Sequence, residues 1–498
     1  MVPPPIDVDA PLPGPSAPAS AEITAEQTPP HDQMGDHIAD LARQQQELLE
    51  IAGMAQPELT TSRFEIVQGY LGVGLVAFLV TLIAVPIVRK LAIANGIVDR
   101  PSEARKQHRM PIAYMGGVAV YLGLMAGILY SYIAGSVPGM MTFHPTEHLL
   151  NGAFHHVVPP SVLLGLTIIM LVGLFDDIWG VAPRVKVGGQ LIAAAALAMQ
   201  DVGTKVAQGV LGPTLGEWLN NRDLTWMIEL PFALPFFETG QIEISLVYWI
   251  GTMIIAIFVL GACNAANLID GLDGLLSGVT SIATLGFLLV AATLALVDDG
   301  AFDAPRLVIC LAVLGACLGF LPHNFNPATI FLGDCGSLLL GYCAAVMILS
   351  LGDTGKTYLV IAGLIIYGIP ITDTLLAIMR RKMAGKKMSD PDADHLHHML
   401  KRAFGVKGAV VSLYGIGLGF AVLGVLISTT KARFVYALAV IFAAYIGVYA
   451  IKIARKAQIE AQTLAYEKKR GLAPPAADVA ASDAEPAPAA SPAASSDA

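Results

Sequence analysis

Strongly apolar stretches with at most one charged residue each recur along the chain between residues 66 and 451, with polar and charged segments separating them. Each stretch is close to the about 20 residues that a helix needs to cross the hydrocarbon core of a membrane. The pattern predicts an all-α polytopic membrane protein with about eleven transmembrane helices. The predicted helices are 66–88, 112–134, 158–175, 187–204, 244–262, 274–297, 306–322, 335–352, 357–379, 409–429 and 433–451.

Two regions depart from this regular pattern. The fourth stretch is the weakest, because Asp201 falls inside it. The segment from 205 to 243 is mostly polar but contains apolar fragments such as 231–237. Such fragments are typical of a small hairpin or of a re-entrant piece that enters the membrane and returns.

The two ends of the chain differ from the apolar core between them. Residues 1–65 and 471–498 are rich in Pro, Ala, Ser and acidic residues, a composition that cannot bury enough apolar surface to fold. We expect an N-terminal disordered tail at 1–65, with an amphipathic helix allowed near 34–51, and a transmembrane domain at 66–455. The tail at 456–498 is expected to be disordered from about 471. No basic region precedes an apolar one at the N-terminus, so no cleavable signal peptide is predicted.

The distribution of charge predicts the orientation in the membrane. If the N-terminus lies outside, 22 of the 30 Lys and Arg residues fall on the inner side, where cytoplasmic loops retain them. The predicted topology is therefore N-out and C-in. The net charge of −9 arises in the tails, since 1–65 carries −9 and 471–498 carries −4, which leaves the core at +4. A mildly basic inner face suits anionic headgroups and phosphate substrates.

Composition also excludes several classes of protein. The chain is 55% hydrophobic and 14% charged, with a mean hydropathy of +0.64, whereas soluble domains carry about 25% charged residues. The five cysteines form no CxxC pair, so neither a disulfide framework nor a structural zinc site is indicated. An acidic chain also gives no support to nucleic-acid binding.

The unusual polar residues of the apolar core fall together on the predicted cytoplasmic side. Polar groups at a membrane boundary are costly and tend to be functional, so this convergence predicts an active site. The clusters are Lys106 to His108, Asp176-Asp177, Asn264 to Asp273, Asn324, Phe331 to Asp334, and Asp394 to His398.

Two of these clusters place carboxylates close together. Adjacent Asp176 and Asp177 raise each other's pKa unless a cation or hydrogen bonds compensate, so the pair either ends a helix in water or meets a metal or cationic partner. In Asn267, Asp270 and Asp273, an amide and two carboxylates recur every three residues. That spacing predicts a shared face of one helical turn, and the intervening glycines allow close approach to a ligand.

Three further residues or motifs each have a structural and a functional interpretation. Asp334 either caps the eighth predicted helix or binds a ligand. His395, His397 and His398 lie in the basic segment after the ninth helix, where a zinc site, an anion site that orients a substrate phosphate, and a plain exposed loop are all open. Asp373 is either a structural partner of a loop cation or part of the site.

The combination of these groups suggests a chemistry. Clustered Asp and Asn oxygens without thiolates suit a hard ion, Mg²⁺ with Mn²⁺ as an alternative, and Mg²⁺ usually binds one or two carboxylates plus substrate phosphates. Nearby Lys, Arg and His residues would neutralise phosphate charge. These are the parts of a phosphoryl-transfer site, and its position at the lipid boundary predicts a lipid phosphate and a soluble nucleotide as substrates.

Six motifs in order resemble one known family. RKQHRMPIAYMGG, GLFDD, NAANLIDGLDG, FNPATIFLGDCGS, PITDT and DADHLHHML are similar to those of the polyprenyl-phosphate N-acetylhexosamine-1-phosphate transferases. HLHH resembles the branch that transfers GlcNAc-1-phosphate from UDP-GlcNAc to undecaprenyl phosphate. The resemblance implies Mg²⁺ dependence, undecaprenyl-pyrophosphoryl-GlcNAc and UMP as products, a multi-pass protein of the bacterial inner membrane, and a role at the start of cell-envelope polysaccharide synthesis.

The resemblance also implies roles for single residues. It assigns Asp334 to Mg²⁺, with Asn267 beside it, and the Asp176-Asp177 pair to the place where the lipid phosphate attacks. Asp270 and Asp273 would hold the nucleotide sugar, Asn324 and Phe331 would contact the uracil, and three histidines would bind the phosphates, namely His395, His397 and His398. A looser role in substrate binding is implied for Asn264, Lys106, His108 and Lys186.

Alternatives of two kinds stay open at this point. The reaction can use another UDP-N-acetylhexosamine or phospho-MurNAc-pentapeptide. A non-catalytic lipid-binding or transport protein is a different class, but transport predicts ionisable residues near the bilayer midplane and matching halves, and the sequence has neither. Because the second pKa of a phosphate monoester is near 6, we expect Asp176 or Asp177 to orient the acceptor phosphate or adjust its protonation.

Overall fold

The computed structural model describes residues 69–99, 111–135, 157–221, 223–229, 241–297, 303–353, 355–383 and 395–429, with isolated residues elsewhere. The predicted tails, the amphipathic segment at 34–51, the loop with Lys106 and His108, and the fragment at 231–237 lie outside the described residues. So does all but one residue of the predicted helix at 433–451.

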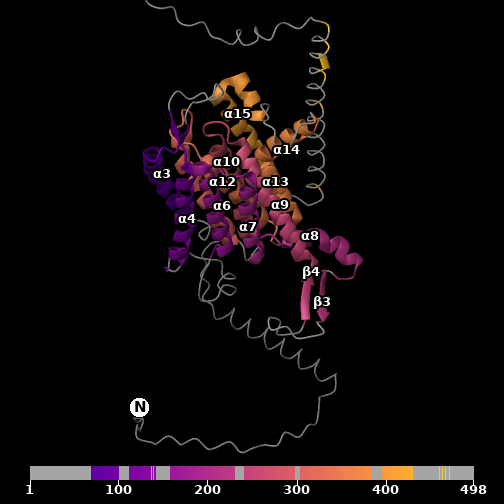
Figure 1. Cartoon of the computed structure of the whole chain (residues 1–498). Helices are drawn as coiled ribbons and strands as arrows, with labels where there is room; N and C mark the ends of the chain where they lie inside the picture. The colour runs from indigo at the N-terminus through magenta and orange to yellow at the C-terminus, as the bar shows by residue number, and fades with distance from the viewer. Residues whose placement is uncertain are drawn as a thin grey trace, which may run out of the picture. The chain divides into compact units, whose positions relative to one another are not determined.

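Helices occupy the other ten predicted stretches (Figure 1). They are α3 (Leu71–Ala94), α4 (Gly116–Gly135), α6 (Pro160–Trp179), α7 (Pro183–Met199), α9 (Leu246–Ile269), α10 (Leu275–Val297), α11 (Asp303–Asn324), α12 (Gly333–Ser350), α13 (Thr357–Ile366), α14 (Gly368–Met383) and α15 (Leu396–Ser428). Prolines at the starts of α6 and α7 suit the first helical turn, where no N–H is needed for the helix.

Within the described residues, eight helices are long and apolar enough to cross a membrane. The total becomes nine if α13 and α14, bent by 79°, count as one broken span. The 17-residue helix α7, which covers the weak fourth stretch, is not among the eight. The structure therefore confirms a helical multi-pass membrane protein, with eight or nine candidate spans in its described part. The count of eleven and the orientation stay predictions.

Two breaks change the predicted course of the helices on either side of the histidine motif. Pro370 sits in the first turn of α14, because a proline inside a longer continuous helix would remove a backbone hydrogen bond and clash with the preceding turn. Gly405 interrupts α15 with φ 70 and ψ 179. The segment before this interruption begins at Leu396, so His397 and His398 lie in a helical turn and not in the predicted loop.

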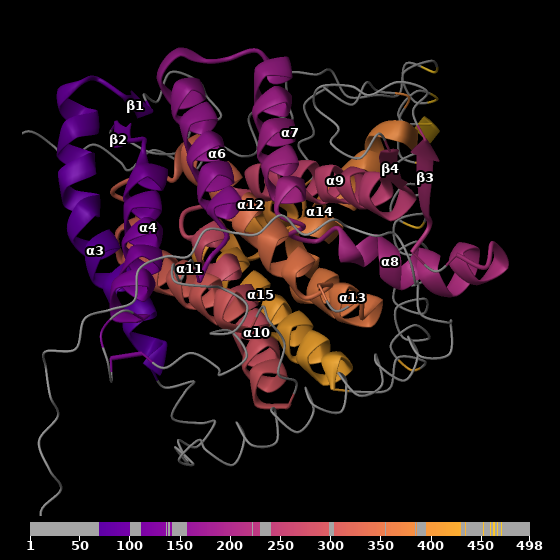
Figure 2. The same ribbon diagram turned by 90° about the horizontal axis from the view of Figure 1, so that it is seen from below.

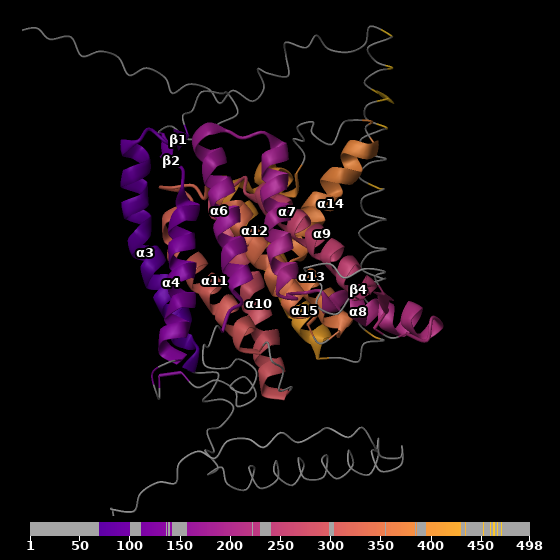
Figure 3. The ribbon, with the colours of Figure 1, turned by 60° about the horizontal axis from the view of Figure 1, so that its bottom comes forward.

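Helix α12 is the centre of the fold. It packs against α4, α6 and α9, and every residue from Cys335 to Ser350 is buried. Helices α3 and α4 lie at one side of the bundle, as Figures 2 and 3 show, and pack against α11. Asp334 is thus attached to the most enclosed of the candidate membrane spans that the structure describes.

The segment between α7 and α9 contains a short helix and a pair of antiparallel strands. It consists of α8 (Lys205–Leu211), a π-helical turn at Gly212–Gly216, and the strands β3 (Thr225–Glu229) and β4 (Gln241–Ser245). The strands pair antiparallel, with Thr225 opposite Ser245. This part lies on the side of the bundle away from α3 (Figure 2).

Three segments that are distant in sequence fix the start of α12. Strands β1 (Val98–Asp99) and β2 (Ile112–Ala113) pair antiparallel, and Ala113 also bridges to Ile330. The Phe331 N–H donates to the Ala113 carbonyl at 2.9 Å, and the Gly116 N–H donates to the Phe331 carbonyl at 2.9 Å. The polar loop before α12 is therefore held to the first turn of α4.

Candidate active site

One end of the bundle gathers most of the predicted polar residues. The C-terminal ends of α6, α9 and α11 meet the N-terminal ends of α7, α10 and α12 there. Aligned helix dipoles leave partial positive charge at the N-terminal ends, and such ends favour anions. The fold therefore brings carboxylates, a lysine and helix N-termini into one region.

Asp334 forms the centre of this region. One of its oxygens, Oδ2, pairs with the Lys186 ammonium of α7. The other, Oδ1, accepts a hydrogen bond of 2.9 Å from the Asn267 amide of α9. Asn267 also lies 2.9 Å from the Ser337 hydroxyl, one turn along α12. Three helices thus hold a single carboxylate, and the predicted metal residues Asp334 and Asn267 are in contact.

Asp176 faces this centre from α6. Its Oδ2 lies 2.7 Å from the Lys186 ammonium, which is also paired with Asp334. Its Oδ1 accepts a 2.9 Å hydrogen bond from the Val181 N–H. Lys186, which the sequence connected only loosely with substrate binding, therefore sits between two carboxylates and is about a quarter exposed.

Asp177, the neighbour of Asp176, has a different position. Its Oδ1 accepts the Asp334 N–H at 2.7 Å, and its Oδ2 accepts the Cys335 N–H at 3.0 Å. These are N–H groups of the first turn of α12, which have no partner within the helix. Asp177 thus caps α12 from another helix, while Asp334 lies in the first turn of α12 and is not its N-cap residue.

Gly333 makes this capping contact possible. Its φ is +70°, a conformation that residues with a side chain rarely adopt. A Cβ at this position would lie 2.4 Å from the Asp177 Oδ2. Only glycine lets the Asp177 carboxylate lie against the backbone at the start of α12.

The expected helical face through Asn267, Asp270 and Asp273 is wrong. Helix α9 ends at Ile269, and Asp270 has φ −74 and ψ 53, outside the helical region. Gly274 then has a φ of +76°. Gly271 lies between the two carboxylates and Gly274 follows them, and both allow the chain to turn away from the helix. Asn267 therefore lies at the end of α9, and Asp270 and Asp273 lie in the loop after it.

Asp270 still belongs electrostatically to the site. Burial, followed by the negative charges of Asp334, Asp177 and Asp273, raises the pKa of Asp270 to about 8. The carboxyl of Asp273, by contrast, accepts hydrogen bonds from the Asn326 side chain at 2.9 Å and from the Ala328 N–H at 3.0 Å. Asp273 thereby holds the loop that leads into α12.

Asn324 and Phe331, the residues expected at the uracil, have contacts within the protein. The Asn324 Oδ1 accepts from the Gly274 N–H at 3.1 Å and from the Ser277 hydroxyl at 3.0 Å, while its Nδ2 donates to the Ile330 carbonyl at 3.0 Å. Asn324 is buried and joins the loop after α9 to the loop before α12. The Phe331 ring is partly exposed, with its centroid 6.0 Å from that of Tyr114.

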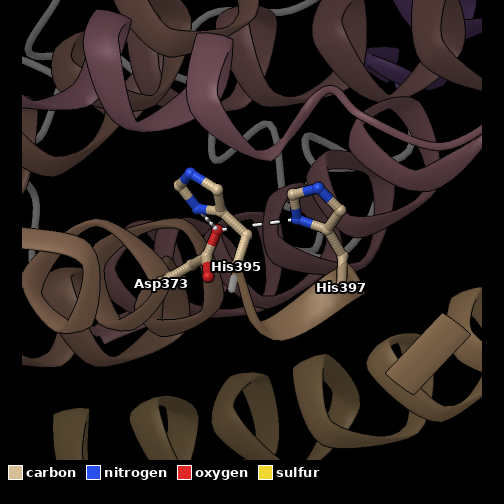
Figure 4. Close-up of side chains that lie close together, drawn as sticks. All are labelled: Asp373, His395 and His397. Carbon is tan, nitrogen blue, oxygen red and sulfur yellow. Dashed lines mark hydrogen bonds and ion pairs between the residues drawn. The ribbon is translucent and has the colours of Figure 1, made fainter. Parts of the chain in front are cut away.

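The histidine motif approaches the same loop from α14 and α15. His395 Nδ1 lies 3.0 Å from the Asp373 Oδ2, and His397 Nδ1 lies 3.6 Å from that oxygen (Figure 4). A Cβ at Gly271 would be 2.5 Å from the His397 Nε2, so the motif touches the loop between Asp270 and Asp273. The His398 ring lies 4.3 Å from the His397 ring, centroid to centroid.

Two predicted groups do not join this set of contacts. The Asn264 amide, one turn before Asn267 on α9, donates to Gln190 Oε1 at 3.1 Å and to the Leu260 carbonyl at 2.7 Å. It therefore faces α7. Lys106 and His108 lie outside the described residues.

Sequence reasoning missed two residues of the site. Ser337 contacts Asn267, and its position three residues after Asp334 in the first turns of α12 was the available signal. Gly333 is needed for the Asp177 contact, but nothing in the local sequence shows that a carboxylate 156 residues earlier lies against it.

The residues around Asp334 fit a divalent cation. Two carboxylate oxygens from different helices converge on one cation, the Lys186 ammonium, and an amide and a hydroxyl lie next to them. Oxygen donors without thiolates are what Mg²⁺ and Mn²⁺ prefer. The Cys335 thiol is no competitor, because it is buried and donates to the Leu332 carbonyl.

Comparison with known proteins places these residues in a family. The model of glycosyl transferase family 4 matches residues 159–352. The chain is 31% identical over 358 residues to a probable undecaprenyl-phosphate N-acetylglucosaminyl 1-phosphate transferase of Bacillus subtilis, an alignment that covers 71% of this chain and 84% of the relative. The chain belongs to glycosyl transferase family 4, the polyprenyl-phosphate N-acetylhexosamine-1-phosphate transferases.

Other relatives match over similar lengths. The decaprenyl-phosphate N-acetylglucosaminephosphotransferase of Mycolicibacterium smegmatis is 33% identical over 345 residues, with 66% of this chain and 74% of the relative covered. A phospho-N-acetylmuramoyl-pentapeptide-transferase of Bacillus thuringiensis is 30% identical over 378 residues, with 72% and 98% covered. The family match at 159–352 includes Asp176, Asp177, Lys186, Asn267 and Asp334.

Proposed function

We propose that this protein transfers GlcNAc-1-phosphate from UDP-GlcNAc to undecaprenyl phosphate, giving undecaprenyl-pyrophosphoryl-GlcNAc and UMP. The observation that carries the proposal is the convergence of Asp176, Lys186 and Asp334 from three helices at one end of an apolar bundle. Relatives at 31% and 33% identity are named for this type of reaction. The reaction would begin a cell-envelope polysaccharide at the cytoplasmic side of the membrane, which the distribution of Lys and Arg favours.

The reaction needs positioning more than proton transfer. An oxygen of the lipid phosphate attacks the UDP-GlcNAc phosphorus that carries the sugar, and the bond from that phosphorus to the bridging oxygen breaks as UMP leaves. Because the second pKa of a phosphate monoester is near 6, the lipid phosphate is mostly dianionic at neutral pH. The Lys186 ammonium, paired with Asp176 and Asp334 in the free protein, would bind phosphate oxygens of the substrates.

The two adjacent aspartates would then have separate roles. Asp176 orients Lys186 through their 2.7 Å contact. Asp177 uses both carboxylate oxygens to hold the start of α12, so it positions Asp334 and does not act as a base. A loop across the site, fixed by Asp273 and Asn324, places Phe331 beside the nucleotide.

Mg²⁺ is the proposed cofactor, with Mn²⁺ as a substitute. Asp334 would hold the ion, with Asn267 and Asp176 beside it. When bound, Mg²⁺ neutralises the charge of the substrate pyrophosphate and of the leaving UMP. The histidines His395, His397 and His398 would bind the phosphates from the opposite side of the loop at Gly271.

The direct test is a reaction with defined substrates. Purified full-length protein is incubated with undecaprenyl phosphate, Mg²⁺ and, separately, UDP-GlcNAc, UDP-GalNAc and UDP-MurNAc-pentapeptide, and UMP release is measured. We expect UMP only with the first donor. Release only with UDP-MurNAc-pentapeptide would support the second candidate, the reaction for which the Bacillus thuringiensis relative at 30% identity is named. Absence of UMP with every donor would disprove the transferase proposal.

Asp270 predicts a measurable release of protons. With a pKa of about 8, about nine-tenths of this carboxyl is protonated at pH 7. A cation bound nearby favours the charged form and lowers that pKa, so binding of Mg²⁺ with UDP-GlcNAc at pH 7 should release close to one proton. Calorimetry in buffers of different ionisation enthalpy measures the number. Asp270→Asn should abolish the release, and an unchanged number in that variant would show that another group titrates.

Lys186 predicts opposite effects on metal binding and on turnover. Lys186→Met removes a positive charge that pairs with Asp176 and Asp334. Removing one charge at this distance is worth about 1–4 kcal/mol, so Mn²⁺ affinity in the absence of substrate should rise about tenfold or more. Turnover should fall about 100-fold, because a stabiliser of phosphate charge is lost. Electron paramagnetic resonance titration and the UMP assay measure the two effects. Weaker Mn²⁺ binding would contradict a competition between lysine and metal.

A further inference from the structure

A buried carboxylate lies behind the histidine motif on a different helix. Asp373 of α14 is 1% exposed. Its Oδ1 accepts the Leu396 N–H at 2.7 Å, and its Oδ2 faces the His395 Nδ1 at 3.0 Å. One side chain thus holds both the beginning of α15 and the first histidine of the motif.

His397 completes the arrangement. Its Nδ1 is 3.6 Å from the same Asp373 Oδ2, too far for a hydrogen bond, and it has no hydrogen-bond partner among the residues that the structure describes. The side chain is 2% exposed. A buried polar atom without a partner costs about 1–3 kcal/mol. A small movement that shortens the distance from His397 Nδ1 to Asp373 Oδ2 would therefore be favourable. Figure 4 shows both Nδ1 atoms on the side of the Asp373 carboxylate.

The Nε2 atoms of His395 and His397 lie in a different environment from their Nδ1 atoms. A ring that presents Nδ1 to a carboxylate carries its Nε2 on the far side. For His397 this side is the loop at Gly271, where a Cβ would be 2.5 Å from Nε2. That loop joins Asp270 to Asp273. His397 therefore presents Nε2 to the loop of the site and Nδ1 to Asp373.

We infer that Asp373 is a positioning residue, which fixes the orientation and tautomer of His395 and His397 so that their Nε2 atoms face the phosphates of the sugar nucleotide. The inference rests on the proposed function for its substrate. A carboxylate buried without a partner is strongly unfavourable. The His395 imidazole and the Leu396 N–H supply its hydrogen-bond partners, and the His397 ring lies beside it at 3.6 Å. The 79° bend between α13 and α14 is what brings Asp373 to the start of α15.

A metal site is the competing use of the same three side chains. Asp373, His395 and His397 place one ligand atom each within 4.8 Å of one another. The 3.0 Å contact of His395 has the ordinary length of an imidazole N–H donating to a carboxylate, and the Asp373 Oδ1 is already occupied by a backbone N–H. These contacts favour a role of Asp373 in hydrogen bonding to the histidine motif over coordination of a metal ion by the three side chains.

The experiment measures steady-state kinetics and metal content of full-length Asp373→Asn, Asp373→Glu and His395→Ala. The matched control is Asp353→Asn, which alters an equally buried carboxylate three residues beyond the other end of α12. For Asp373→Asn we expect kcat/KM for UDP-GlcNAc to fall about 10- to 100-fold, as for other groups that orient a functional imidazole. The KM for undecaprenyl phosphate should stay within about twofold, Asp373→Glu should recover part of the loss, and Asp353→Asn should keep the wild-type value.

A double variant separates positioning from a general loss of stability. If Asp373 acts through His395, the loss of kcat/KM in the variant that combines Asp373→Asn with His395→Ala should be no larger than the loss in the more damaging single variant. Independent losses would instead multiply. If Asp373→Asn does not fold, kcat/KM is measured for His395→Ala, His397→Ala and the variant with both changes. Losses that multiply in the double variant would overturn the inference that one carboxylate supports both rings.

Two results would overturn the inference while the proposed function stands. One is wild-type kinetics in Asp373→Asn. The other is a stoichiometric metal ion that the purified wild-type protein retains and Asp373→Asn loses, which would make the three residues ligands. Wild-type protein that releases no UMP would instead show that the proposed function has failed.

Discussion

Asp334→Asn is expected to lower kcat by about 10²- to 10³-fold while the protein remains folded, because it removes a charge on which three helices converge. The asparagine keeps the size of the side chain and an oxygen that can accept from Asn267. It loses the ion pair with Lys186 and the carboxylate proposed to hold Mg²⁺. UMP release at saturating substrates measures kcat, and thermal unfolding in detergent checks the fold.

The binding of Mn²⁺ gives this prediction a second measurement. Asp334→Asn should weaken Mn²⁺ binding at least tenfold, because a neutral amide replaces the carboxylate among hard oxygen ligands. Asp353→Asn is again the control, since Asp353 lies after the far end of α12 and should change neither turnover nor Mn²⁺ binding. Wild-type turnover in Asp334→Asn would show that the metal and the chemistry are elsewhere.

Gly333→Ala is expected to abolish nearly all activity without any change in a polar side chain. The methyl group would lie 2.4 Å from the Asp177 Oδ2, so the carboxylate must leave the N–H groups of Asp334 and Cys335. A side chain at positive φ adds about 1–2 kcal/mol of strain. The start of α12 should shift and carry Asp334 away from Lys186. We expect kcat to fall about 100-fold or more, as when a reacting group is displaced by about 1 Å.

Gly96→Ala is the matched control for this substitution. Gly96 has a φ of +72°, but a Cβ there would meet nothing within 4 Å. Both variants therefore bear similar backbone strain, and only Gly333→Ala presses on the capping carboxylate. The UMP assay and thermal unfolding are applied to both. Equal losses of activity in the two variants would show that strain, and not the contact with Asp177, causes the effect.

Some errors of prediction have a local cause. The spacing of Asn267, Asp270 and Asp273 fits a helical face, but the glycines that accompany it end α9 at Ile269. The histidine motif lies among charged residues typical of a loop, yet His397 and His398 lie in the first turn of α15. In both places the backbone followed turn and capping preferences that spacing alone did not weigh.

Hydropathy alone did not determine the number of spans. The apolar stretch at 357–379 reads as one helix, but Pro370 and its neighbours allow a 79° bend between α13 and α14. A hydropathy pattern reports how apolar a segment is, and apolar segments inside a large bundle need not cross the membrane straight. The bend has a consequence for the site, because it brings Asp373 under the histidine motif.

The sequence by itself determined the class of the protein, because burial in lipid demands long apolar helices whatever their neighbours are. It also predicted a set of site residues, several of which the structure brings together, since carboxylates, amides and histidines at membrane boundaries are costly to keep without a function.

Only the tertiary structure separated the roles of adjacent residues. Asp176 contacts Lys186, whereas Asp177 caps a helix whose first N–H groups lie 157 residues further along the chain. Asp373 likewise gains its role from histidines on another helix. Hydrogen bonds and ion pairs depend on distances of a few ångströms between side chains, and for residues far apart in the chain those distances exist only after the helices have packed.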